Sequence, residues 1–105
     1  MAFYLIQAKP TVDFWSHTLS SPDVIRGQWL NIVVERLGGK VHGLWASFGE
    51  YDMIVICELP DHVSAAALSL AYYTAGTMVS VKTTPLLSVD EAVAALRKAS
   101  GDAST

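Results

Sequence analysis

The stretch FGEYDMIVICELPD, residues 48–61, decides how this chain folds. It contains Gly49-Glu50, then an almost wholly apolar run, then Pro60-Asp61. Glycine followed by another residue is the sequence preference of a two-residue type II′ hairpin turn. The flanking segments, 40–48 and 51–59, are therefore predicted to be antiparallel neighbours, with Phe48 paired to Tyr51.

Upstream of this hairpin, a strand and a helix are predicted. The apolar run AFYLIQA, residues 2–8, has the composition of a strand, and Pro10 stops it. Residues 11–20 have mixed polarity and no period, so we expect a loop there. A helix should run from Ser21-Pro22-Asp23 to Gly38-Gly39, because a serine cap and an early proline precede apolar residues at spacings of three and four. These residues are Ile25, Trp29, Ile32, Val33 and Leu37.

Downstream, Pro60-Asp61 should begin a second helix that Gly76 ends, and residues 77–86 should form a fourth strand broken by Pro85. The sequence Ser88-Val89-Asp90-Glu91 has the form of a capping box and predicts a short third helix through Leu96. The order is β-α-β-β-α-β, which is typical of an α+β ferredoxin-like fold with a four-stranded antiparallel sheet. We expect one domain, residues 1–99, and a mobile polar tail, residues 100–105.

Composition narrows the class of protein. The chain has 105 residues, of which 51% are hydrophobic and 16% charged, with a net charge of -3. Charged residues interrupt every apolar run before it reaches membrane-spanning length, and the first ten residues lack a signal-peptide pattern, so we expect a cytoplasmic protein with no membrane partner. The lysines and arginines are scattered, which argues against nucleic acid as a partner. Cys57 is the single cysteine and cannot form an internal disulfide.

The hairpin is apolar on both faces, and this predicts an assembly. With the expected register, one face carries Trp45, Ile54 and Ile56, and the other carries Leu44, Val55 and Cys57. In this topology the two main helices cover one face only, so a second copy of the chain is expected to cover the other. We therefore predict a homodimer or a higher oligomer. The alternative is that the third helix and the tail fold back over the open face.

The motif at Gly49, Tyr51 and Asp52, with the following MIVICELPD, resembles the GYD-domain family, small prokaryotic proteins named for these three residues. The similarity extends to LGGKVHG, residues 37–43, and to Pro60-Asp61, and it covers most of the chain up to the fourth strand. The resemblance implies a ferredoxin-like fold within the dimeric α/β-barrel superfamily. That superfamily includes cofactor-free monooxygenases, isomerases, haem-handling enzymes and ligand-sensing modules, so the resemblance selects no single activity.

Asp52 and His42 are the candidate catalytic residues. Asp52 lies at the start of a strand on the same predicted face as Trp45, where apolar neighbours could make it a general base. Its alternative role is to accept backbone N–H groups and hold the turn, which is the commoner task for an aspartate beside a turn. His42 is predicted on the opposite face among apolar residues, either as an acid, base or ligand, or as a core histidine.

Aromatic residues supply the candidate ligand contacts. Tyr4, Trp45 and Tyr51 are predicted to contact a ligand, although strand aromatics more often serve packing. Trp15 and Trp29 could also line an apolar pocket, although the position of Trp29 on the helix stripe favours a core role. Tyr72-Tyr73 could cover a cavity mouth or an interface. No metal-ligand spacing, phosphate-binding loop or serine elbow is present, so no metal and no cofactor are expected.

The sequence therefore predicts a dimeric α/β-barrel protein that binds a small apolar ligand or serves as an interaction module. One alternative is a cofactor-independent enzyme, of monooxygenase or isomerase type, that acts on a small apolar substrate through Asp52 and His42. Another is a purely structural dimer without a pocket.

Overall fold

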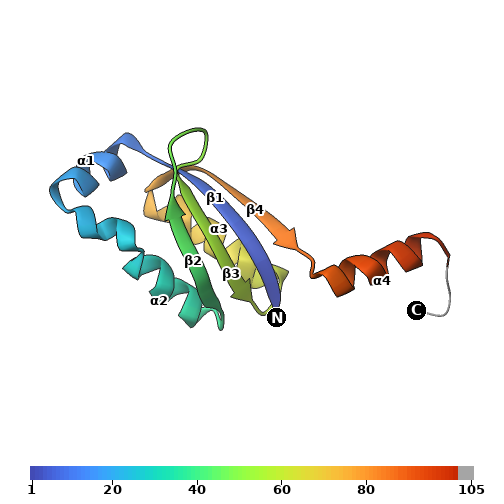
Figure 1. The fold of residues 1–105 in the computed structure, drawn as a ribbon. Helices are drawn as coiled ribbons and strands as arrows, with labels where there is room; N and C mark the ends of the chain where they lie inside the picture. Colours follow the sequence, from blue (N-terminus) through green and yellow to red (C-terminus); the bar gives the residue numbers. More distant parts are fainter. Residues whose placement is uncertain (102–105) are drawn as a thin grey trace.

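The protein is a mixed α/β chain built on one four-stranded antiparallel sheet. A computed structural model describes residues 1–101. The strands are β1 Ala2–Pro10, β2 Lys40–Ala46, β3 Met53–Leu59 and β4 Met78–Leu86. They are ordered β2-β3-β1-β4, with β1 and β3 in the centre (Figure 1). The predicted α and β content and the four-stranded antiparallel sheet are confirmed.

The helices are α1 Val12–Ser20, α2 Gln28–Arg36, α3 His62–Ala75 and α4 Val89–Ala99, with a 3₁₀ turn, η1 Pro22–Arg26, between α1 and α2. Leu30 and Val34 of α2 and Leu68 of α3 are buried against the β1 side chains Tyr4 and Ile6, so both helices cover the same face of the sheet. One face of the sheet therefore holds the hydrophobic core.

The first prediction that fails is the loop at residues 11–20, which is the helix α1. The Thr11 hydroxyl accepts a hydrogen bond from the backbone N–H of Phe14 at 3.1 Å, and Asp13 lies in the first turn. A capping threonine and an early acid favour a helix start even where the apolar spacing is irregular. This helix matters because it builds one wall of the candidate site.

The single helix predicted from residue 21 to residue 37 is also wrong. Gly27 adopts a left-handed conformation, with φ 79°, and separates η1 from α2. A left-handed residue ends one helical segment, so α2 starts afresh at Gln28. Its buried side consists of Leu30 and Val34, whereas Trp29 and Ile32 are 42% and 50% exposed. The expected apolar stripe is thus partly on the surface.

The β2-β3 hairpin has the predicted register near its closed end, but the connection between the strands differs from the predicted turn. Gly43–Ala46 pair with Met53–Ile56 as expected. The strands end at Ala46 and begin again at Met53, so residues 47–52 form a loop instead of a two-residue turn. Gly49 does not have the positive φ that the first position of a type II′ turn requires. Gly49 therefore does not serve as the first residue of a type II′ turn.

A bulge in β2 changes the position of His42. Val41 pairs with Cys57 and Gly43 pairs with Ile56, which leaves His42 as an extra residue. Its imidazole lies 2.9 Å from the Glu58 carboxylate and 5.0 Å from the ring of Phe3. Phe3 and Glu58 alternate with core residues along their strands, so His42 belongs to the open face and not to the core face predicted for it.

The second half of the chain follows the prediction closely. The Asp61 carboxylate caps α3 by accepting from the N–H of Ser64 at 2.8 Å, and Gly76 ends the helix with φ 71°. Pro85 is tolerated because β4 is an edge strand. The capping box at Ser88 and Glu91 is present, and α4 continues to Ala99 instead of Leu96.

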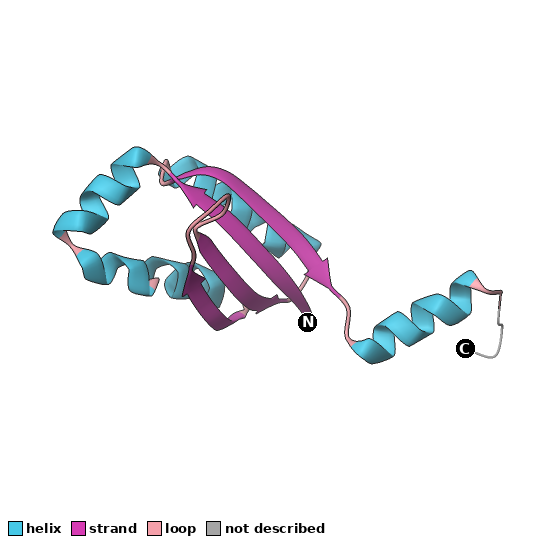
Figure 2. Ribbon diagram, turned by 45° about the horizontal axis from the view of Figure 1, so that its top comes forward, coloured by secondary structure: helices cyan, strands magenta, loops and turns pink. Residues whose placement is uncertain are grey.

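The open face of the sheet has no cover within residues 1–101. The helix α4 extends away from the sheet and does not fold back over it (Figures 1 and 2). Phe3 and Trp45 on that face are 42% and 54% exposed. The tail prediction falls mainly on residues 102–105, which lie outside the described residues. None of the helices described here has the length and apolar character needed to cross a membrane.

Candidate functional site

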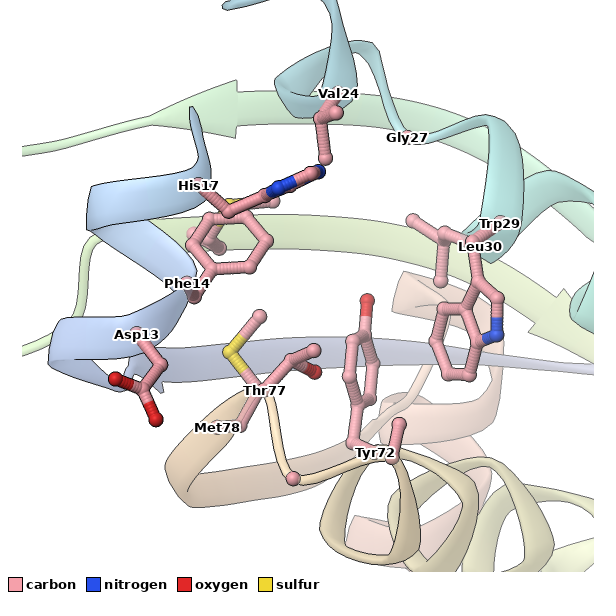
Figure 3. Close-up of a pocket in the computed structure, with 13 residues that line it drawn as sticks. Asp13, Phe14, His17, Val24, Gly27, Trp29, Leu30, Tyr72, Thr77 and Met78 are labelled. Atoms are coloured by element: carbon pink, nitrogen blue, oxygen red, sulfur yellow. The ribbon is translucent and has the colours of Figure 1, made fainter. Parts of the chain in front are cut away.

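A cavity of about 530 Å³ lies on the helix side of the sheet, between α1, the start of α2 and the C-terminal end of α3 (Figure 3). This volume is within the usual range of small-molecule sites. Three aromatic side chains line it, together with aliphatic and sulfur-containing side chains. The full lining is Asp13, Phe14, His17, Val24, Gly27, Trp29, Leu30, Met53, Tyr72, Ala75, Gly76, Thr77 and Met78.

The cavity lies where α1, the start of α2 and the C-terminal end of α3 do not pack directly against one another. The Thr11 cap directs α1 outward from the end of β1, and its hydroxyl also reaches the carbonyl of Thr77 at 3.4 Å. Gly27 then turns the chain back toward the sheet, and a side chain at this position would meet Leu44. Phe14 of α1 is thereby held opposite Trp29 of α2, with Tyr72 of α3 below them (Figure 3).

Tyr72 is the principal polar group in the interior of the cavity. The residue is only 3% exposed, and its ring lies 4.9 Å from that of Trp29 at an angle of 53°. In Figure 3 its hydroxyl points up into the space between Phe14 and Leu30. Burial raises the pKa of this phenol, followed by a smaller effect of Cys57. The hydroxyl is therefore protonated and able to donate a hydrogen bond.

The remaining polar side chains lie toward the mouth. Asp13 and His17 are exposed, and Thr77 is half-buried. The imidazole of His17 turns toward Val24, while the Asp13 carboxylate points away from the cavity (Figure 3). No lysine or arginine belongs to the lining. The interior thus offers an apolar, aromatic surface with one hydroxyl and no positive charge.

Asp52 lies outside this cavity and binds its own loop. Its carboxylate accepts from the N–H of Gly49 at 3.0 Å and lies 3.7 Å from the ammonium of Lys9. Its backbone N–H donates to Ala8 at 3.1 Å and its carbonyl accepts from Ser47 at 2.8 Å. The glycine and aspartate of the motif therefore bond to each other and close the loop, which is the turn-holding role considered for Asp52.

His42 and Asp52 are not brought together. His42 pairs with Glu58 at the far end of β3, six residues from Asp52, which corresponds to about 20 Å of extended strand. The two residues cannot act on one small molecule within a single chain. The catalytic role predicted for each stays a prediction.

The three predicted ligand contacts also lie apart. The hydroxyl of Tyr4 is 2.9 Å from Nδ1 of His62, and its ring is in the core. Tyr51 is half-buried in the 47–52 loop. Trp45 packs over Gly43 and lines a smaller pocket of about 300 Å³ beside Ile25 and Arg26. None of the three lines the main cavity.

Part of the lining of the cavity agrees with the predictions from the sequence. Trp29 and Tyr72 were considered for a pocket or a cavity mouth, and both line the cavity. Phe14 and His17 were missed because their segment was interpreted as a loop. The signal that could have found them is Thr11 followed by Asp13, a cap and a first-turn acid. Within residues 1–101 no group of three His, Cys, Asp or Glu side chains is arranged to hold a metal ion.

The fold and the cavity together define a small mixed α/β protein with an apolar pocket under its sheet. The sequence matches the GYD domain over residues 4–96, so the chain belongs to the GYD domain family, as its motif indicates. No curated protein matches the chain.

Proposed function

We propose that this protein binds a small, largely apolar molecule in the cavity between α1, α2 and α3. The observation that supports this is the cavity itself, with about 530 Å³ of space and walls formed by Phe14, Trp29 and Tyr72. Because protein interiors are closely packed, a well-formed apolar pocket of this size is a candidate binding site. Asp52 and His42 lie outside the cavity, which favours binding over turnover at this site.

The binding proposal is tested by filling the cavity from its rim. Ala75 lines the cavity but is exposed on α3, so Ala75→Phe adds bulk to the site without entering the core. Ala66 is exposed on the same helix and does not line the cavity, so Ala66→Phe is the matched control. A naphthalene-sized hydrocarbon should bind the wild type and Ala66→Phe, as measured by titration calorimetry, and should lose at least about tenfold in affinity for Ala75→Phe. Absence of binding to the wild type would refute the proposal.

We also propose that two chains pair in the manner of a ferredoxin-like α/β barrel, through the open faces of their sheets. Support comes from the apolar open face, where Leu5, Ile54 and Ile56 remain half-exposed and Phe3 and Trp45 more so. Apolar surface of this kind is usually covered. The helix α4 does not cover it, since it extends away from the sheet and leaves Val89 and Leu96 80% and 70% exposed.

The dimer proposal is tested by introducing a carboxylate on the open face of the sheet and, as a control, on the helix side. Ile56→Asp places a carboxylate in the centre of the open face and should convert a dimer into a monomer. Val63→Asp, on the exposed side of α3, should leave the assembly unchanged, because Val63 is 78% exposed on the helix side. Sedimentation equilibrium measures the mass directly. A wild-type mass of 11.3 kDa at micromolar concentration would exclude the homodimer.

A further inference from the structure

The most deeply buried polar side chain of the cavity lining is a hydrogen-bond donor without a protein partner. Tyr72 is 3% exposed, and its hydroxyl makes no hydrogen bond to another residue in the described part of the chain. Every fully buried side-chain oxygen or nitrogen there has a partner, so the Tyr72 hydroxyl is a group that remains accessible from the cavity. Two other buried hydroxyls have protein partners: that of Tyr4 lies 2.9 Å from Nδ1 of His62, and that of Thr18 donates to the carbonyl of Phe14. Buried polar groups are normally satisfied. The Tyr72 hydroxyl instead faces the cavity, where a ligand can reach it (Figure 3).

From this arrangement we infer that the cavity takes a neutral aromatic molecule that carries a carbonyl group, and that the Tyr72 hydroxyl donates a hydrogen bond to the carbonyl oxygen. This inference rests on the proposed binding function and specifies the ligand of that same site. The ligand carbonyl oxygen supplies the acceptor that the Tyr72 hydroxyl does not find within the protein. A ligand without an acceptor would leave the hydroxyl desolvated and unpaired.

The charge of the lining excludes acidic ligands. A carboxylate or phosphate buried in the cavity would need a cation, and the lining has no lysine or arginine. Arg26 lines the smaller pocket instead. The one carboxylate of the lining, that of Asp13, is exposed and points away from the cavity (Figure 3). A neutral carbonyl oxygen can accept from the Tyr72 hydroxyl without this cost.

The shape of the walls favours an aromatic skeleton. Trp29 and Tyr72 meet at 53° with their centroids 4.9 Å apart, so their rings form two sides of a wedge. Phe14 faces this wedge across the cavity (Figure 3). Flat rings can contact such walls by offset stacking or by edge-to-face packing. Met53 and Met78 complete the apolar lining with flexible side chains that adapt to ligand shape.

The test compares three naphthalenes of similar size: 2-acetylnaphthalene, 2-isopropylnaphthalene and 2-naphthoate. Titration calorimetry on the wild type should show the ketone binding about tenfold more tightly than the hydrocarbon, the contribution of one buried hydrogen bond. The naphthoate should bind more weakly than both. In Tyr72→Phe the ketone should lose this advantage while the affinity for the hydrocarbon stays the same. The conservative change removes only the hydroxyl.

Failure of this inference differs from failure of the proposed function. If all three compounds bind the wild type with equal affinity, the cavity binds small molecules but the carbonyl assignment is wrong. If none binds, the binding function itself is wrong. Should Tyr72→Phe not fold, the infrared carbonyl stretch of 2-acetylnaphthalene bound to the wild type replaces it. A shift to lower wavenumber than in hexane supports the hydrogen bond, and an unshifted band overturns it.

Discussion

Replacing Asp52 should loosen the loop that joins β2 to β3. The residue is 8% exposed, and its carboxylate accepts from the N–H of Gly49 at 3.0 Å. Removal of an ionised acceptor of this kind costs about 2 kcal/mol. The contact with Lys9, at 3.7 Å from a lysine side chain that is 47% exposed, should add less than about 1 kcal/mol. Asp52→Ala is therefore expected to lower the free energy of unfolding by about 2 to 3 kcal/mol.

Two further variants divide this effect into its parts. Asp52→Asn keeps an oxygen that can accept from Gly49 and loses the charge, so it should cost about 1 kcal/mol. Gly49→Ala keeps the donor, and its added carbon would meet no atom within 4 Å at a residue without positive φ. Gly49→Ala should therefore change stability by less than about 0.5 kcal/mol.

Urea unfolding at one fixed protein concentration measures all three variants, since a dimer would otherwise make the midpoint depend on concentration. The slope of the transition should stay constant, because the substitutions leave the buried surface unchanged. Equal losses in Asp52→Ala and Gly49→Ala would refute the loop-closing role. Binding of 2-acetylnaphthalene by Asp52→Asn should match the wild type, because Asp52 is not part of the cavity.

Three other predictions concern packing and ionisation. Gly39→Ala should destabilise the fold by about 3 kcal/mol in urea unfolding, because the added carbon would meet the Glu58 carbonyl and approach a Leu59 methyl to 2.7 Å; a loss as small as that of Gly49→Ala would contradict this. Burial raises the pKa of the Cys57 thiol from 9.0 to about 11, so its contribution to stability is present below pH 9.0 and is lost as the pH rises toward 11. At pH 8 the native thiol should react with a disulfide reagent about 100-fold more slowly than the urea-unfolded chain, and equal rates would show that Cys57 is accessible. The pKa of Glu91 is lowered from 4.5 because the Ser88 N–H donates to its carboxylate, so the capping box is fully formed above pH 4.5 and is lost as the pH falls below it. The protection factors of the α4 amides, corrected for intrinsic exchange, should fall in that acid range, and Glu91→Gln should remove this pH dependence.

Local signals account for the elements that were predicted correctly. Pro60-Asp61 and Gly76 bound α3, and the Ser88 capping box starts α4, since each signal acts within one helical turn. The hairpin register near Ala46 also follows from alternation along the strands. The motif identified the family, and the match over residues 4–96 confirms it.

The predictions that failed depend on interactions beyond the local pattern. The apolar spacing of residues 25–37 is compatible with one helix, but Gly27 must turn left-handed for Leu30 and Val34 to reach the core. Alternation along β2 places His42 in the core, whereas the bulge turns it toward Glu58. Neither the left-handed conformation of Gly27 nor the bulge at His42 can be predicted from the few residues on either side of it.

The sequence by itself determined the four strands, the helices α3 and α4, the antiparallel sheet and the family, because periodicity and capping are encoded over short stretches. Only the tertiary structure decided where the cavity lies. Its aromatic walls come from Phe14, Trp29 and Tyr72, which are far apart in the chain and meet only when α1, α2 and α3 pack against the sheet. The unpartnered hydroxyl of Tyr72 follows from that packing, since a local pattern cannot show that a donor will face an empty space.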